Sequence, residues 1–283
     1  MIGTAQFGLP YGIANNNKQV DKIEVDRILN LAFKEGINGI DTAASYGTSE
    51  NIIGRYLKEH NYQNWYIVTK LNGSISQLYD QLSYSIDKLS TKPNAVLAHS
   101  AADYIDSKFY DLFLKLRTTF NIDQIGVSVY TKKQIECILE RQIPDIIQCP
   151  LNILDTRLFR CGIFSRLKEE NVSIHIRSVF LQGMFYLSDK IINTNFPDVF
   201  PTINKLRIIA QNNELTLAEL SLLWVCSLEQ IDKVILGVNT MSQLKSHINT
   251  LKKNIHKTVY KEALSYNYEN TNVLDPSNWT DKN

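Results

Sequence analysis

The fold class is decided by residues 39–54, GIDTAASYGTSENIIG, which run from a short apolar segment through a turn into an amphipathic segment. The apolar segment leads to Asp41, where a β-strand is expected to end. Ser49 is a candidate helix N-cap, and Glu50 places an acid in the first helical turn. One helical face then carries Ile52, Ile53, Tyr56 and Leu57. The stretch predicts one strand–turn–helix unit.

The same alternation of strand and helix continues along the chain. Short β-branched or aromatic runs, most of them beside Gly, Pro, Asn or Asp, predict strands. These runs are Ile2–Gln6, Gly36–Asp41, Trp65–Lys70, Ala95–His99, Ile125–Val129, Ile146–Pro150, Ser173–Val179 and Lys233–Val238. Segments with helical spacing separate them, among them one that follows Asp21 as N-cap and carries Ile23, Ile28, Leu31 and Ala32 on one face.

Strands that each precede a helix predict an α/β fold, a (β/α)8 TIM barrel with its parallel sheet closed on itself. An open doubly wound sheet is the alternative. Against it, residues 8–12 after the first strand lack the third glycine of a dinucleotide-binding turn, and Pro10 interrupts them. No Gly-, Ser- or Pro-rich linker divides the sequence, so we expect a single domain over residues 1–283.

Two segments lie outside this repeat. Residues 183–201, between the seventh strand and its helix, contain several aromatic residues and are expected to form a loop. That loop either covers the substrate or folds onto the outer helices. Residues 266–283 form a polar tail that either caps the barrel or is partly disordered.

The composition excludes several classes of protein. The 30 Lys and Arg residues nearly balance the 29 Asp and Glu residues, so no basic surface for nucleic acid is expected. No apolar run is long enough to span a membrane, and no signal peptide is visible, so we expect a cytoplasmic protein. The four scattered cysteines are expected to be reduced and buried, without a metal. No sequence feature specifies an oligomeric state.

Four polar residues are expected together at the active face of such a barrel, where the strands end. Asp41 ends the second predicted strand, Tyr46 follows it, Lys70 ends the third strand and His99 the fourth. Taken singly, each has a structural explanation: a strand-end cap, an aromatic plug, a snorkelling lysine and a core histidine. Their coincidence at one end of neighbouring strands favours a functional site.

The chemistry that these groups support is narrow. A phenol is a poor acid at neutral pH, and a nearby ammonium stabilises the phenolate that it leaves behind. Lys70 can supply the ammonium if Asp41 keeps it charged, and His99 can orient a substrate oxygen. The sequence therefore predicts that Tyr46 protonates an alkoxide as it forms, which is the chemistry of carbonyl reduction.

Residues 39–54 resemble the signature of the aldo-keto reductases. Further matches follow in the family's order at Val68–Lys70, Leu97–His99, Gly126–Tyr130 and Gln148–Asn152. The resemblance extends from Gly3 to about Leu251. The segments Gly3–Gly8 and Arg177–Gly183 resemble members found in bacterial surface-polysaccharide and sugar pathways.

The resemblance implies that Asp41, Tyr46, Lys70 and His99 are the family's catalytic tetrad, and that the barrel binds NADP(H) without a Rossmann fold. Asp41 also belongs to the implied cofactor-binding set. The other members at the nicotinamide and pyrophosphate end are Gly3 and Thr4 near the ribose, Ser128 and Gln148 at the carboxamide, Arg177 against the ring, and Ser178 and Phe180 near the pyrophosphate. At the adenosine end they are Gly237, Asn239, Gln243 and His247.

The adenosine end departs from the family's pattern. Members usually supply a Lys or Arg to the 2′-phosphate, whereas residues 237–243 contain no cation, and His247 replaces a common Asn. Because phosphate prefers charged donors, we expect NADP(H) to be preferred modestly, with NAD(H) as a second cofactor. Lys245 and the amides of a helix N-terminus are the groups left to hold the phosphate.

The sequence predicts an NAD(P)H-dependent oxidoreductase that reduces a small aldehyde or ketone, with sugars and keto-sugars among the candidate substrates. Two alternatives stay open. One is a nicotinamide-binding regulatory subunit with little turnover. The other is a non-redox barrel lyase that uses Lys70 to form a Schiff base.

Overall fold

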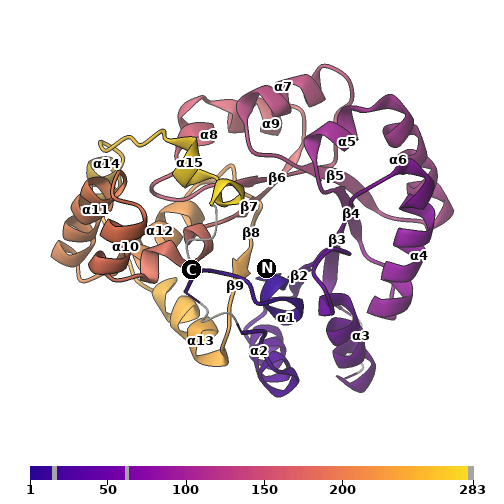
Figure 1. Ribbon diagram of the computed structural model, residues 1–283, viewed down its shortest axis with the longest axis horizontal. Coiled ribbons are helices and arrows are strands. Elements are labelled where there is room, and N and C mark those ends of the chain that lie inside the picture. The colour runs from indigo at the N-terminus through magenta and orange to yellow at the C-terminus, as the bar shows by residue number, and fades with distance from the viewer. Residues whose placement is uncertain (15–17, 61–63, 280–283) are drawn as a thin grey trace.

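A ring of parallel strands forms the centre of the molecule in the computed structural model, which describes residues 1–14, 18–60 and 64–279 (Figure 1). The sheet has nine strands in the order β8-β7-β6-β5-β4-β3-β2-β1-β9. β8 (Lys233–Val234) pairs with β7 (Ser173–Arg177), and β9 (Leu236–Gly237) pairs with β1 (Ile2–Gly3). These two short pieces occupy one strand position, so they close the predicted TIM barrel.

The remaining strands follow the predicted order. They are β2 (Gly39–Asp41), β3 (Tyr66–Leu71), β4 (Ala95–Ala98), β5 (Gln124–Ser128) and β6 (Ile146–Pro150). The first predicted strand differs most, because β1 stops at Gly3 and a short helix, α1 (Ala5–Gly8), follows. The Thr4 amide and hydroxyl both donate to the Asp41 carbonyl oxygen, at 3.0 Å each, which turns the chain there.

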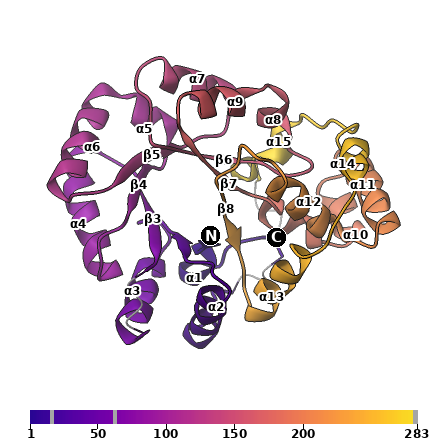
Figure 2. The ribbon, with the colours of Figure 1, turned by 180° about the vertical axis from the view of Figure 1, so that it is seen from behind.

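Helices surround this ring, and a second group of helices stands outside it beside β7 and β8 (Figures 1 and 2). The helices around the ring are α2 (Lys22–Lys34), α3 (Ser49–His60), α4 (Leu78–Leu89), α5 (Ala101–Ile105), α6 (Ser107–Thr119), α7 (Lys132–Leu139), α8 (Arg157–Arg160), α9 (Ile163–Glu169), α12 (Leu217–Cys226) and α13 (Met241–Thr250). The second group contains α10 (Asp189–Asn195), α11 (Phe200–Asn212) and α14 (Lys257–Ala263). Short turns of helix are η1 (Ile75–Gln77), η2 (Leu181–Tyr186), α15 (Thr271–Leu274) and η3 (Pro276–Asn278).

In helix α2 the sequence predicted the N-cap correctly but misplaced one residue of the buried face. Asp21 caps the helix as predicted, because its carboxylate accepts from the Glu24 amide at 3.0 Å. Ile23 was expected on the buried face, but it is 67% exposed. The buried face instead carries Val25, Ile28, Leu29 and Ala32, which follow the i, i+3, i+4, i+7 spacing more closely.

The segment 183–201 is largely helical rather than a loop. It contains α10, and Phe185 and Phe196 are buried in the main hydrophobic core. Phe196 also packs against Trp279 of the tail, with ring centroids 4.9 Å apart. Most of the segment therefore lies against the outer helices, and its role as a substrate loop stays a prediction.

The prediction of buried cysteines is wrong at two positions. Cys149 is buried in β6 and Cys137 is half-buried, but Cys161 and Cys226 are exposed because they lie where α8 and α12 end. Within the described ranges, no helix has both the length and the apolar character needed to cross a bilayer.

Alternate residues of the strands point into the barrel. Val68, Leu97 and Ile146 form one interior cluster, whereas their neighbours Ile67, Val96 and Ile147 pack against helices. Space in this interior is tight: a Cβ atom on Gly126 would lie 2.2 Å from the Ile146 carbonyl oxygen. A glycine is therefore required at this point of β5.

His175 occupies the same interior layer and is 1% exposed. Its Nδ1 atom has no hydrogen-bond partner among the described residues. Burial lowers the pKa of His175 from 6.5 to about 4, because the charged imidazolium is not solvated there. The folded protein therefore holds this histidine neutral.

The pKa of His175 makes stability depend on pH. Because the folded-state pKa lies below the ordinary value of 6.5, its contribution is complete above pH 6.5 and is lost as the pH falls towards 4. We expect the free energy of unfolding to fall by up to about 3 kcal/mol from this residue over that range. His175→Gln should flatten the pH dependence measured by urea denaturation. Equal pH dependence in both proteins would contradict this account.

Candidate active site

Side chains alternate between the two faces of a strand, and this alternation brings the candidate residues together at one end of the barrel. Lys70 lies two residues after the inward-facing Val68, and His99 lies two residues after Leu97. Gln148 and Arg177 follow Ile146 and His175 in the same way. Side chains two apart on a strand share a face, so all four point to the axis at the carboxyl end of the barrel.

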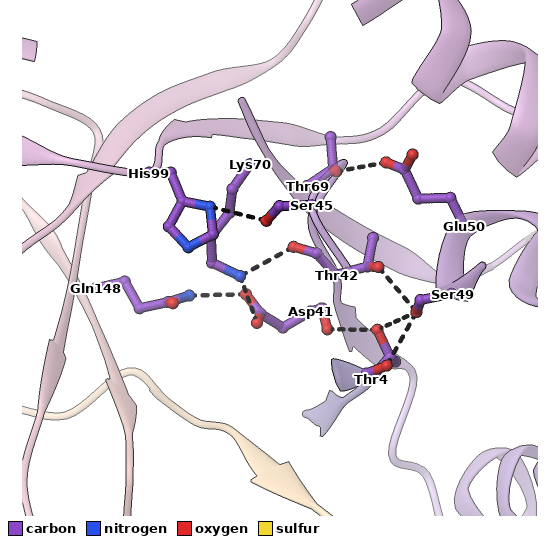
Figure 3. Close-up of polar contacts among 10 residues, drawn as sticks. All are labelled: Thr4, Asp41, Thr42, Ser45, Ser49, Glu50, Thr69, Lys70, His99 and Gln148. Carbon is purple, nitrogen blue, oxygen red and sulfur yellow. Dashed lines mark hydrogen bonds and ion pairs between the residues drawn. The ribbon is translucent and has the colours of Figure 1, made fainter. Parts of the chain in front are cut away.

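A buried ion pair stands at the centre of this end (Figure 3). Lys70 Nζ donates to Asp41 Oδ2 at 2.6 Å and to the Thr42 carbonyl oxygen at 2.9 Å, and the Lys70 side chain is 1% exposed. Burial alone would lower the pKa of Lys70, but the Asp41 carboxylate and the Tyr46 hydroxyl raise it above its usual value. Gln148 Nε2 donates to the other oxygen, Asp41 Oδ1, at 2.7 Å. Lys70 is thus held as an ammonium.

Tyr46 and His99 lie beside this pair. The ammonium nitrogen of Lys70 is 5.1 Å from the centroid of the Tyr46 ring, and the rings of Tyr46 and His99 meet edge to face at 6.1 Å. Burial, together with the charges of Lys70 and Arg177, lowers the pKa of His99 to about 4, so its imidazole is neutral at pH 7. His99 Nδ1 lies 3.3 Å from Ser45 Oγ, which leaves Nε2 as the other hydrogen-bonding atom of the ring.

The turn that carries Tyr46 is fixed to its neighbours. The Ala44 amide donates to the Lys70 carbonyl oxygen at 3.0 Å, and Ser49 Oγ donates to the Thr4 carbonyl oxygen at 3.0 Å. Ser49 therefore ties α3 to the loop after β1, where the sequence suggested a helix cap. The fit against Gly8 is close, because a Cβ atom there would lie 1.8 Å from the Tyr46 carbonyl oxygen. The position of Tyr46 is thereby set by β1, β3 and α3.

A cavity of about 480 Å³ opens above these groups. Every site residue predicted from the sequence lines it: Gly3, Thr4, Asp41, Tyr46, Lys70, His99, Ser128, Gln148, Arg177, Ser178, Phe180, Gly237, Asn239, Gln243 and His247. The structure thus brings the predicted catalytic and cofactor residues together, and their individual roles stay proposals.

Sequence reasoning missed further lining residues. Tyr11 and Gln182 come from the loops after β1 and β7, and Pro276 and Ser277 come from the C-terminal tail. The Ile13 amide donates to the Gln182 carbonyl oxygen at 3.1 Å, so the two loops touch. For Tyr11 and Gln182, the only indication in the sequence was that they follow the carboxyl ends of predicted strands. The sequence allowed the tail to cap the barrel, but no local pattern singled out Pro276 or Ser277 as lining residues.

The cavity suits a nicotinamide cofactor. Gln148 Oε1 is a buried acceptor without a partner among the described residues, which matches an amide donor such as a carboxamide. Gly3 of β1 and Gly237 of the paired β9 line the cavity together with Gln6.

Strained backbone marks the turn after β7. Ser178, Leu181 and Gln182 have φ angles of 62°, 46° and 51°, in the left-handed region that side chains disfavour. Such residues gather at functional sites, where the surrounding structure enforces them. This turn also carries Ser178 and Phe180, and their place near the pyrophosphate stays a prediction.

Arg177 contacts the loop that follows β5, and its place against the nicotinamide stays a prediction. Its guanidinium lies 4.2 Å from the centroid of the Tyr130 ring, and it donates to the Val129 carbonyl oxygen at 3.3 Å. The stacking on Tyr130 holds this cation at the side of the cavity.

The Asp41–Lys70 pair should dominate the stability of this end of the barrel. Asp41→Asn leaves a buried lysine without its counter-charge, which should lower the free energy of unfolding by about 3–5 kcal/mol. Adding Lys70→Met should recover most of that loss, because both buried charges are then gone. Urea denaturation of both variants measures this, and a single variant within about 1 kcal/mol of wild type would contradict it.

Known proteins share this architecture. The model of the aldo/keto reductase family matches residues 1–266. The L-glyceraldehyde 3-phosphate reductase of Escherichia coli K12 is 22% identical over 302 residues, which cover 86% of this chain and 83% of that protein.

Solved structures agree in fold. The holo form of an aldo-keto reductase from Bacillus halodurans superposes with a TM-score of 0.77 at 20% identity, covering 95% of this chain and 93% of that one. The glycerol dehydrogenase of Gluconobacter oxydans gives a TM-score of 0.71 at 20% identity, covering 93% and 89%. With the tetrad geometry and the barrel already described, the match of the family model over most of the sequence shows that this chain belongs to the aldo/keto reductase family.

Proposed function

We propose that the protein is an NAD(P)H-dependent reductase of an aldehyde or ketone, with Tyr46 as the proton donor. The observation that carries the proposal is the buried, charged Lys70 beside the Tyr46 ring. An ammonium in this position stabilises the phenolate that forms when the tyrosine gives up its proton. Membership of a family of carbonyl oxidoreductases supports the same chemistry.

The protein groups divide the work between them. The nicotinamide supplies a hydride to the carbonyl carbon when it is bound. Tyr46 gives its hydroxyl proton to the carbonyl oxygen as negative charge develops there. Neutral His99 donates a hydrogen bond from Nε2 to the same oxygen and so orients it. Asp41 keeps Lys70 charged throughout, and Gln148 holds the Asp41 carboxylate from the other side.

The lyase alternative fits the site less well. A lysine that forms a Schiff base must lose its proton before it attacks a carbonyl. The raised pKa of Lys70 and its hydrogen bonds to Asp41 and Thr42 oppose that loss. A regulatory subunit with little turnover would keep the same geometry, and only turnover measurements separate it from an enzyme.

We propose a small hydroxylated carbonyl compound, such as a sugar or keto-sugar, as the substrate. The similar proteins named above are a reductase of L-glyceraldehyde 3-phosphate and a dehydrogenase of glycerol. The cavity offers hydrogen-bonding groups from Tyr11, Gln182 and Ser277 around the tetrad. Turnover of aldehydes, keto-sugars and nucleotide-linked keto-sugars with both cofactors tests this class.

Tyr46→Phe tests the proton donor. The ring still packs, so we expect cofactor binding to persist while turnover of an activated aldehyde falls by about 100-fold or more. Tyr84→Phe is the matched control, because Tyr84 is an exposed tyrosine of α4 that does not line the cavity, so this variant should keep its turnover. A Tyr46→Phe protein with more than about a tenth of wild-type turnover would rule out this role.

A further inference from the structure

A second cavity adjoins the active-site cavity at its adenosine end. It measures about 450 Å³ and shares Ala14, Asn239 and Gln243 with the first cavity. Its remaining wall includes Asp21 and Glu24 at the start of α2. The family resemblance places the adenosine ribose in this region, so these residues stand near the group that distinguishes NAD(H) from NADP(H).

Glu24 occupies the helix N-terminus that a phosphate would use. Its Oε1 atom accepts from the Met241 amide at the start of α13 at 2.6 Å. Two further amides of this turn are also engaged, because Gln243 Oε1 accepts from the Asn239 amide at 2.7 Å and Thr240 Oγ1 accepts from the Gln243 amide at 3.1 Å. The sequence suggested that the amides of this helix N-terminus hold the 2′-phosphate, but side chains of the protein already bind three amides of the segment, those of Asn239, Met241 and Gln243.

Two acceptors of the second cavity match a ribose hydroxyl. Asn239 Oδ1 is buried and has no hydrogen-bond partner among the described residues. Glu24 is a carboxylate whose side chain is 19% exposed at the cavity. A ribose hydroxyl can donate a hydrogen bond to either oxygen, whereas a phosphate dianion has no proton to donate. Both acceptors therefore match a free 2′-hydroxyl, and an acidic residue in this role is how dinucleotide folds recognise NAD.

The charges around the second cavity also oppose a phosphate. Among the residues that line it, Lys18 is positive, and Asp21 and Glu24 are negative. Arg27 binds Glu24 Oε2 at 3.2 Å from the solvent side, where it is 63% exposed. Lys245, which the sequence suggested as a phosphate ligand, is exposed and lines neither cavity.

We propose that Glu24 is a specificity-determining residue that selects NAD(H) over NADP(H). Its carboxylate repels a 2′-phosphate and accepts a hydrogen bond from the 2′-hydroxyl of the adenosine ribose. This inference rests on the proposed nicotinamide-dependent function and reverses the cofactor preference expected from the sequence.

Binding measurements on the wild-type protein and Glu24→Gln test the proposal without turnover. Fluorescence titration should show NADH binding at least about tenfold more tightly than NADPH in the wild type. Glu24→Gln keeps an acceptor for the Met241 amide, so it should tighten NADPH about tenfold and change NADH less than about threefold. Calorimetry with adenosine 5′-phosphate and adenosine 2′,5′-bisphosphate should show the same change without a nicotinamide.

Glu35→Gln is the matched control, because it removes the same charge from the exposed C-terminal end of α2 and should leave both affinities unchanged. Tighter binding of NADPH than of NADH by the wild type would overturn the proposal. If Lys18→Gln then lost this preference for NADPH, Lys18 would be the residue that binds the 2′-phosphate. The proposal for Glu24 would also be overturned if Glu24→Gln left the ratio of the NADH and NADPH dissociation constants unchanged. Binding of neither dinucleotide would instead contradict the proposed function, and this inference with it.

Discussion

The active end of the barrel depends on one buried ion pair, that of Lys70 with Asp41. Two charges with almost no exposure to solvent are costly unless each is paired and hydrogen-bonded. Here the ammonium binds a carboxylate and a backbone carbonyl, and Gln148 from β6 binds the second carboxylate oxygen. The pair thereby links β2, β3 and β6, and it presents one stabilised positive charge to the ring of Tyr46.

The rest of the site follows from how the strands close. Because side chains two apart on a strand share a face, the inward-facing apolar layer is succeeded by an inward-facing polar layer at the carboxyl end. The loops that begin there carry the groups that complete the cavity. A break at Ile235 lets β8 pair with one side of the opening and β9 with the other, and Gly237 of β9 lines the cavity.

The sequence predicted the barrel, the order of its strands and the meeting of Asp41, Tyr46, Lys70 and His99 at one end of it, because each depends on local pattern. A strand–turn–helix unit is visible in 39–54, and the strand-end positions of Lys70 and His99 follow from the same periodicity. The end of β1 at Gly3 could not be predicted, because Thr4 turns the chain through hydrogen bonds to Asp41, far away in sequence. Glu24 escaped notice for the same reason, since its partner is the Met241 amide of the last barrel helix.

The central claim is that Tyr46, supported by Lys70, delivers a proton to the substrate oxygen during reduction. A solvent deuterium isotope effect on single-turnover reduction, followed through the absorbance of the nicotinamide, tests it most directly. If the tyrosine proton moves in the step that is observed, reduction is slower in D₂O than in H₂O for the wild-type protein. The residual reaction of Tyr46→Phe then loses that difference. Equal rates in the two solvents for the wild type, measured where hydride transfer limits the rate, would contradict the account.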